Sequence, residues 1–294
     1  MKILITGGSG FVGKNLHESL RKSYDVIAPS SRDLNLLDYS KLESYIKKEK
    51  PNIIINAAVR GGTTVLDNTL RMFAGLMRVV GHVDKIIHFG SGAEYAKTRD
   101  LIKVKETDWG EYIPKDDYGL AKYMIHHIVR NEKKIVNLRL FGIYGKYEDY
   151  RYKFISNSIV KTLLNLPIAI KQDVVFDYLY IDDLLPIVQY FIEHNWQHSS
   201  YNITPKESIS LKSLVNKIIT ISKSTKKMTL INEGLNYQYT ASNDRLIAEI
   251  PNLKFTSYDQ GLKKLYKYYK SIRNNLDKEA ILQDNYLARS KIKH

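Results

Sequence analysis

Short, continuously apolar runs alternate with segments of helical periodicity along the first half of this 294-residue chain. Because neither face of these runs is polar, they are typical of parallel strands that are covered by helices on both sides. Strands that alternate with helices predict an α/β fold with a doubly wound parallel sheet. The expected strands are 2–6, 25–28, 52–58, 85–89 and 135–141, and the expected helices are 11–22, 39–50, 67–80 and 117–131.

A glycine-rich turn separates the first expected strand from the first expected helix, with Gly7, Gly10 and Gly13 in the pattern G-x-x-G-x-x-G. Glycines let the backbone turn tightly and approach a pyrophosphate, and the helix N-terminus offers free N–H groups and a partial positive charge. An ordinary glycine-rich turn is the alternative, but the position between strand and helix favours dinucleotide binding. The sequence therefore predicts a Rossmann-type nucleotide-binding domain.

The end of the second expected strand indicates which dinucleotide is preferred. The acid that usually binds the ribose of NAD is missing there, and the sequence reads Ala28-Pro29-Ser30-Ser31-Arg32. Ser30, Ser31 and Arg32 are suited to hold a 2′-phosphate, so NADP is favoured over NAD. The alternative is a solvated loop with an arginine that has no role in binding.

Tyr118 and Lys122 are four residues apart at the start of an expected helix, so both side chains lie on one helix face. A nearby ammonium stabilises a phenolate and lowers its pKa, which suits the tyrosine for acid–base work. Ser91, at the end of an expected strand, can hydrogen-bond the same substrate oxygen. Tyr266 and Lys270 have the same spacing, but without such a serine they are interpreted as part of an amphipathic helix.

Charge and composition exclude several classes of protein. The chain has 45 Lys and Arg against 31 Asp and Glu, a net charge of +14 that suits phosphate-bearing partners. It has no cysteine, which excludes disulfides and cysteine nucleophiles. No signal peptide follows Met1, and no apolar run approaches the roughly 18 residues of a membrane span. We expect a cytoplasmic protein that does not enter a membrane.

These motifs together resemble the extended short-chain dehydrogenase/reductase family, the NAD-dependent epimerases and dehydratases. The resemblance implies an NAD(P)-dependent oxidoreductase that acts on a nucleotide sugar, most simply a 4-keto reductase in the synthesis of deoxysugar or cell-surface polysaccharide precursors. The alternatives are a 4-epimerase with retained NAD and a non-catalytic dinucleotide sensor. The resemblance rests on the glycines, Asn56-Ala57-Ala58, Ser91, Tyr118 and Lys122, and extends to 138–145 and 178–183, while 31–38 is similar to GDP-fucose synthases.

The resemblance also implies roles for individual residues. The implied catalytic residues are Ser91, Tyr118 and Lys122. The implied cofactor-binding residues are Gly7, Gly10, Phe11, Val12, Gly13, Ser30, Arg32, Asn35, Leu36, Ala57, Ala58 and Lys122. The implied substrate-binding residues are Ser91, Gly92, Tyr118, Lys153 and Arg245. A homodimer is expected, whereas a metal site is not, and the basic aromatic stretch 263–270 is interpreted as an amphipathic helix rather than a nucleic-acid site.

Several positions depart from the family pattern. Gly92-Ala93 stands where 4,6-dehydratases have Asp-Glu, which makes dehydration unexpected. Ala93 and Lys153 match the places of the Cys and His with which fucose synthases epimerise carbons next to a ketone. We therefore expect a reductase that preserves the configuration at carbons 3 and 5 of the sugar. Phe176 replaces an arginine that contacts the substrate phosphates, and the candidate substitutes are Arg151, Lys153 and Arg245.

The second half of the chain has a less regular order of elements, with expected helices at 154–164, 211–221 and 258–269 and a strand near 176–181. We expect a Rossmann domain at 1–165, to which 174–195 returns. A smaller mixed α/β substrate domain is expected at 166–294, with a basic C-terminal tail. The polar, basic sequence beyond Ser271 predicts partial disorder.

Overall fold

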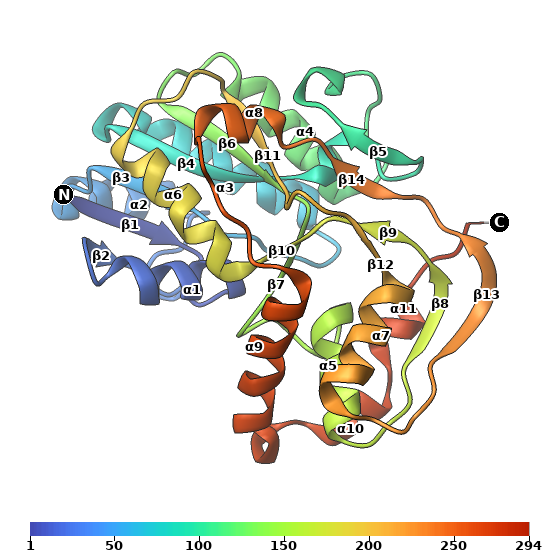
Figure 1. Ribbon diagram of the computed structural model, residues 1–294. Helices are drawn as coiled ribbons and strands as arrows, with labels where there is room; N and C mark the ends of the chain where they lie inside the picture. Colours follow the sequence, from blue (N-terminus) through green and yellow to red (C-terminus); the bar gives the residue numbers. More distant parts are fainter. Residues whose placement is uncertain (294) are drawn as a thin grey trace.

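The computed structural model describes residues 1–293. Its centre is a six-stranded, fully parallel sheet in the order β11-β6-β4-β3-β1-β2 (Figure 1). This is the doubly wound Rossmann sheet that the sequence predicted. Its strands are β1 (Lys2–Thr6), β2 (Asp25–Ile27), β3 (Ile53–Asn56), β4 (Lys85–Ser91), β6 (Ile135–Leu140) and β11 (Ser200–Ile203).

Helices cover both faces of this sheet, and successive strand residues point to opposite faces. Leu4 and Ile54 pack with Leu42 and Phe73 on one face. Their neighbours Ile3, Ile5, Ile53 and Ile55 belong to the cluster on the other face. Burial on both faces therefore explains why these strands are continuously apolar. One face is covered by α2 (Tyr39–Glu49), α3 (Val65–Val79) and α4 (Asp117–Val129), and the other by α1 (Phe11–Leu20) and α6 (Leu184–Glu193).

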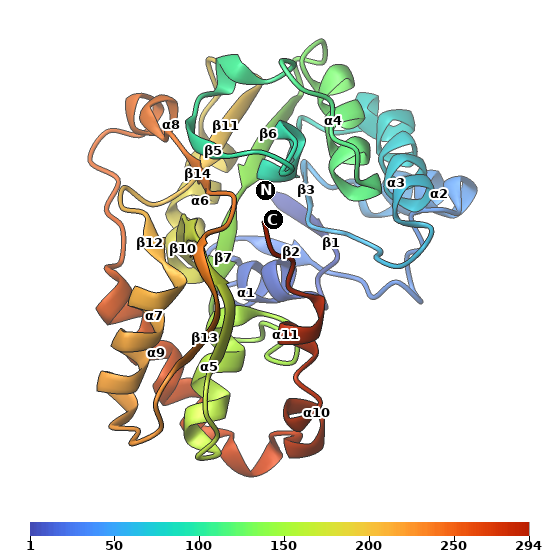
Figure 2. The same cartoon turned by 90° about the vertical axis from the view of Figure 1, so that its right-hand side faces the viewer.

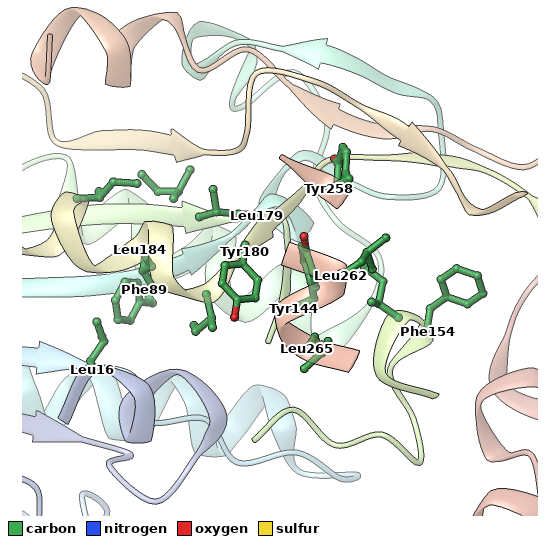
Figure 3. Close-up of a cluster of buried hydrophobic side chains, with 14 of the residues drawn as sticks. Leu16, Phe89, Tyr144, Phe154, Leu179, Tyr180, Leu184, Tyr258, Leu262 and Leu265 are labelled. Atoms are coloured by element: carbon green, nitrogen blue, oxygen red, sulfur yellow. The ribbon is translucent and has the colours of Figure 1, made fainter. Parts of the chain in front are cut away.

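A second, smaller region is built on three packed helices, α5 (Phe154–Leu163), α7 (Leu211–Ser222) and α9 (Tyr258–Ser271). Beside them β8 (Ala169–Asp173) pairs in parallel with β13 (Thr229–Leu235). Figure 3 shows that one hydrophobic core joins both regions, with Leu16 and Leu184 at one end and Phe154 and Leu265 toward the other.

Short strands connect the two regions in two further sheets. The pair β10–β7 forms one sheet, and the other has the order β12-β9-β14-β5. These elements are β5 (Leu101–Val104), β7 (Gly142–Tyr144), β9 (Val175–Phe176), β10 (Tyr178–Tyr180), β12 (Ile209–Ser210) and β14 (Tyr239–Ala241), and α8 (Asp244–Glu249) follows β14.

The strand expected at 176–181 is two strands, β9 and β10, which belong to different sheets. Asp177 separates them because its buried carboxylate accepts hydrogen bonds from the Ser208 hydroxyl and the Ala241 backbone N–H and pairs with Lys103. Strand β11 is an edge strand of the central sheet, and it lies after the segment 174–195 that was expected to return to the Rossmann domain. Its buried Asn202 breaks the apolar pattern by which the other central strands were found.

The segment after Ser271 forms two short helices, α10 (Lys278–Leu282) and α11 (Asn285–Arg289), so the expected disorder is wrong for this part of the tail. Ile281 is buried, and the Tyr286 ring lies 5.2 Å from that of Phe154. Asp284 pairs with Lys161 at 2.6 Å. These contacts order a sequence that is polar by composition. Among residues 1–293, no helix combines the length and apolar character needed to cross a lipid bilayer.

Candidate active site

A cleft of about 620 Å³ opens at the carboxyl ends of β1 and β3, where ligands bind in doubly wound sheets. Eight of the predicted cofactor-binding residues line it. They are Gly7, Gly10, Phe11, Val12, Asn35, Leu36, Ala57 and Ala58. Gly13, Ser30, Arg32 and Lys122 do not line the cleft itself.

The glycine turn is shaped for close backbone approach. Gly7 has a φ of +71°, and a Cβ there would lie 2.7 Å from the Ala57 carbonyl. A Cβ at Gly13 would lie 2.2 Å from the Gly7 oxygen, so Gly13 allows α1 to pack against the turn. The helix then begins at Phe11 without a side-chain cap, which leaves its first N–H groups directed at the cleft. A dinucleotide pyrophosphate fits this cradle.

The segment after β2 contains both free and bound polar side chains. Arg32 is exposed and has no ion-pair partner within 4 Å among residues 1–293, whereas the Ser30 hydroxyl donates to Asp33 at 2.7 Å. Arg60, which the sequence analysis did not select, lines the cleft together with Ser31. Two exposed arginines are thus available here, Arg60 in the lining of the cleft and Arg32 next to the lining residue Ser31.

Ser91 ends β4, and the turn after it is fixed by a capping box. The Ser91 Oγ accepts a hydrogen bond from the Ala93 N–H at 3.2 Å, and Glu94 Oε1 accepts one from the Ser91 N–H at 3.0 Å. The Glu94 carboxylate also binds Arg139. The S-x-x-E spacing of Ser91 and Glu94 is a sequence signal for this role that the analysis did not use.

Tyr118 reaches Ser91 because α4 packs closely on the turn after β4. A Cβ at Gly119 would lie 2.9 Å from the Ala93 carbonyl oxygen, so glycine permits this approach. Asp116 caps the helix by accepting from the Gly119 N–H at 2.9 Å. The Ser91 side chain is close enough to the Tyr118 phenol to lower its pKa, against the larger effect of burial.

The pKa of Tyr118 differs from the sequence-based expectation. Burial raises it, and the nearby Ser91 side chain offsets only part of that effect. The Lys122 ammonium is not among the groups that shift this pKa, and it donates to the Phe89 carbonyl at 2.7 Å. Burial also lowers the pKa of Lys122 to about 8, with the Glu94 charge acting in the opposite direction. The site therefore holds a protonated phenol at neutral pH.

Tyr239 is a second phenol at this site, and the sequence analysis missed it. Burial raises the pKa of Tyr239 well above the ordinary value, and the nearby Ser91 side chain acts in the opposite direction. A Cβ at Gly92 would lie 2.5 Å from the Tyr239 oxygen and 2.6 Å from the Phe141 ring. A side chain such as the dehydratase aspartate has no room at Gly92 in this packing. No local sequence pattern identifies Tyr239, since β14 comes far later in the chain.

Of the cationic residues expected to bind the substrate, the two arginines are bound to other groups and the lysine is exposed. Arg245 donates to the Ser200 carbonyl at 3.1 Å and faces Glu106, and Arg151 forms two 2.8 Å hydrogen bonds with Asp149. The structure does not bring either guanidinium to Ser91. Lys153, which precedes α5, is exposed and affects the pKa of Lys97, a neighbour of Tyr118.

The second tyrosine–lysine pair lies elsewhere. Tyr266 and Lys270 are on α9 and line a polar hollow of about 350 Å³ with Thr162 and Arg273. Neither the glycine turn nor Ser91 contributes to this hollow. The spacing of four residues alone therefore did not distinguish the two pairs, whereas their position relative to Ser91 did.

Comparison with known proteins agrees with this geometry. Residues 3–204 match the model of the NAD dependent epimerase/dehydratase family. The chain belongs to this family. It is 28% identical over 229 residues to a GDP-L-colitose synthase of Yersinia pseudotuberculosis. The aligned region covers 66% of this chain and 73% of that protein. A GDP-6-deoxy-D-talose 4-dehydrogenase of Aggregatibacter actinomycetemcomitans is 26% identical over 223 residues, covering 69% and 74%.

A solved structure has the same fold. The NADP-bound GDP-L-fucose synthetase of Naegleria fowleri superimposes with a TM-score of 0.82 at 17% identity, over 93% of each chain. The family and this fold support a nicotinamide dinucleotide as cofactor.

Proposed function

We propose that this chain is an NAD(P)-dependent reductase that converts the 4-keto group of a nucleotide sugar, most simply a GDP-sugar, into a hydroxyl group. The observation that carries the proposal is the position of the half-buried Tyr118 at the start of α4, where Gly119 packs on the turn that follows Ser91 and the Ser91 hydroxyl is near enough to affect the Tyr118 phenol. Reduction of a ketone requires a proton donor, and a phenol that stays protonated at neutral pH suits that direction. The two GDP-sugar enzymes among its relatives support the choice of substrate class.

Each residue has a defined task in this proposal. When bound, a reduced nicotinamide supplies a hydride, which no side chain can provide. Ser91 hydrogen-bonds the ketone oxygen and orients it, and Tyr118 donates its proton to that oxygen as the carbonyl becomes an alcohol. Lys122, whose pKa is about 8, is placed on the same helix face to reprotonate Tyr118 or to bind the cofactor ribose.

NADP is the proposed preferred cofactor. Arg32 is exposed, and a guanidinium binds a phosphate through charge-assisted hydrogen bonds. Arg60 adds a second cation at the edge of the same cleft. The adjacent Asp33 carboxylate already accepts a hydrogen bond from Ser30.

The proposal is tested by a product assay. The enzyme is incubated with NADPH or NADH and with 4-keto-6-deoxy derivatives of GDP-, UDP- and dTDP-sugars, and consumption of the reduced cofactor and the product are followed. We expect stoichiometric oxidation of the cofactor and a 4-hydroxy sugar. Interconversion of 4-hydroxy epimers without net cofactor consumption identifies a 4-epimerase instead, and cofactor binding without turnover of any substrate identifies a sensor.

A further inference from the structure

Three lysines gather beside Tyr118. The Lys97 Nζ lies 6.0 Å from the centre of the Tyr118 ring. Partial burial of this ammonium lowers its pKa most, and the nearby charges of Lys153 and Lys291 lower it further. All three lysines are exposed. Among residues 1–293, no carboxylate lies within 4 Å of any of their ammonium groups. The negative charge of Asp116, whose carboxylate caps α4, acts on Lys97 in the opposite direction and raises its pKa.

Lys291 belongs to a segment far from the others in sequence, Ser290–Lys293, which we call the strap. Its backbone is fastened to the β8–β13 ribbon. The Lys171 ammonium donates to the Ser290 carbonyl at 2.8 Å, and the Asn236 amide donates to the Lys291 carbonyl at 2.7 Å. The Gln172 side chain binds both the N–H and the carbonyl of Lys293. Four polar contacts thus fix the course of this short segment.

The strap also bridges to the loop that carries Lys97. The Lys293 ammonium pairs with Asp100 at 3.4 Å and lies 4.5 Å from the centre of the Tyr237 ring. Asp100 is held in turn by the Gln238 N–H at 2.8 Å. Figure 2 shows the chain after α11 running from the lower helices toward the central sheet. The strap therefore connects the smaller region to the loop between β4 and β5.

The two arginines expected to contact the substrate phosphates are already bound to other groups. Arg151 is occupied by Asp149, and Arg245 by Ser200 and Glu106. Phe176 contributes an aromatic ring that packs on Tyr239 at 5.6 Å. Lys97, Lys153 and Lys291 therefore supply unpaired positive charge on the side of Tyr118 where these arginines do not.

We propose that Lys97, Lys153 and Lys291 bind the diphosphate of the nucleotide sugar, and that the strap is a part of the substrate site. This inference rests on the proposed function. Ammonium groups this close together repel one another, and a dianionic diphosphate relieves the repulsion. Lysine binds phosphate as a point charge, so three flexible side chains adapt to the two phosphates. The Lys293–Asp100 pair holds the strap in the position from which Lys291 acts.

The experiment measures binding rather than turnover. Dissociation constants for GDP, GMP and NADPH are determined by calorimetry for the full chain and for Lys291→Gln. The matched control is Lys278→Gln, which removes the same charge from an exposed position on α10. Because the proposed site recognises the second phosphate, GDP is expected to bind more tightly than GMP. In Lys291→Gln, GDP binding weakens about tenfold and the advantage of GDP over GMP shrinks, while NADPH binding is unchanged.

A second variant tests the strap itself. Asp100→Asn removes the partner of Lys293 without changing any of the three lysines, and we expect a smaller loss of GDP affinity in the same direction. GDP binding by Lys291→Gln that equals the binding by Lys278→Gln overturns the strap proposal and leaves the reductase proposal standing. If the unmodified chain binds NADPH but none of GDP, UDP and dTDP, both the strap and the nucleotide-sugar assignment are wrong.

Discussion

Glu94 and Arg139 form an ion pair of 2.6 Å in which neither side chain is exposed to solvent. The same carboxylate accepts hydrogen bonds from the Ser91 N–H and the Asn137 amide. The Arg139 guanidinium also donates to the hydroxyl of Ser200 at 3.1 Å. This network lies directly beneath the turn that carries Ser91, so we infer that Glu94 is a positioning residue for the catalytic serine.

Removal of one partner of this ion pair is expected to lower the free energy of unfolding. Glu94→Gln leaves the Arg139 cation buried without a counter-charge, and we expect a loss of about 3–5 kcal/mol in the free energy of unfolding. The double variant Glu94→Leu/Arg139→Met removes both charges and is expected to lose less than Glu94→Gln alone. Urea denaturation of the three proteins checks this order. A double variant that is less stable than Glu94→Gln contradicts it.

The catalytic role of Tyr118 is tested by Tyr118→Phe, which removes the proton donor and keeps the ring. Turnover is expected to fall at least ~100-fold, whereas NADPH affinity stays within twofold or so of the unmodified enzyme. Tyr266→Phe is the matched control because Tyr266 has the same spacing to a lysine but lies on α9, away from Ser91. Full turnover in Tyr118→Phe eliminates the mechanism.

Much of the fold was predictable because local sequence determines it. Three consecutive isoleucines, Ile53 to Ile55, form the buried part of β3, and burial on both faces of the sheet produces such runs. Strand β11 escaped because it has only four residues, of which Ser200 and Asn202 are polar, and the Asn202 amide donates to the Val104 carbonyl at 3.1 Å. That partner is almost a hundred residues away, so the polar residue looks like a strand breaker in sequence.

The candidate site was predictable only in part for the same reason. Gly7 and Tyr118 belong to short motifs with recognisable spacing. Tyr239 and Lys291 do not, since tertiary packing alone brings them to Ser91 and Lys97. The expectation that Lys122 lowers the pKa of Tyr118 was wrong for this structure because burial of the phenol outweighs it, and spacing on a helix face does not reveal how deeply a side chain is buried.

Glu148 gives the protein a pH-dependent stability. Burial raises its pKa from 4.5 to about 7, although the Ser156 hydroxyl donates to it. Since the folded state holds the proton more tightly than the unfolded state, this stabilising contribution is complete below about pH 4.5 and is lost as pH rises through about 7. Glu148→Gln stays neutral, so we expect it to be about 1–3 kcal/mol more stable than the unmodified protein near pH 8.

Urea denaturation near pH 5 and near pH 8 measures this effect, with Glu207→Gln as an exposed control. The gain in Glu148→Gln is expected at the higher pH and not at the lower one. Equal stability changes at both pH values mean that Glu148 does not titrate in this range.

Cofactor choice is tested by Arg32→Ala. Because Arg32 is proposed to bind the 2′-phosphate through charge-assisted hydrogen bonds, the variant is expected to bind NADPH about tenfold more weakly. NADH lacks that phosphate, so its dissociation constant is expected to change little. Both constants are obtained from fluorescence titration. An unmodified enzyme that binds NADH more tightly than NADPH refutes the assignment.

The last prediction concerns stereochemistry. Epimerising a carbon beside a ketone requires a base on one face and an acid on the other. Ala93 is completely buried and has no acid–base group, and Lys153 is exposed beside Lys97 rather than enclosed next to Ser91. We therefore expect carbons 3 and 5 to keep their configuration. The enzyme is incubated with a GDP-4-keto-6-deoxy sugar in deuterated water without reduced cofactor, and the sugar is examined by NMR. Deuterium at carbon 3 or 5 above a control without enzyme shows that the chain epimerises its substrate, in which case Lys153 becomes the first residue to replace.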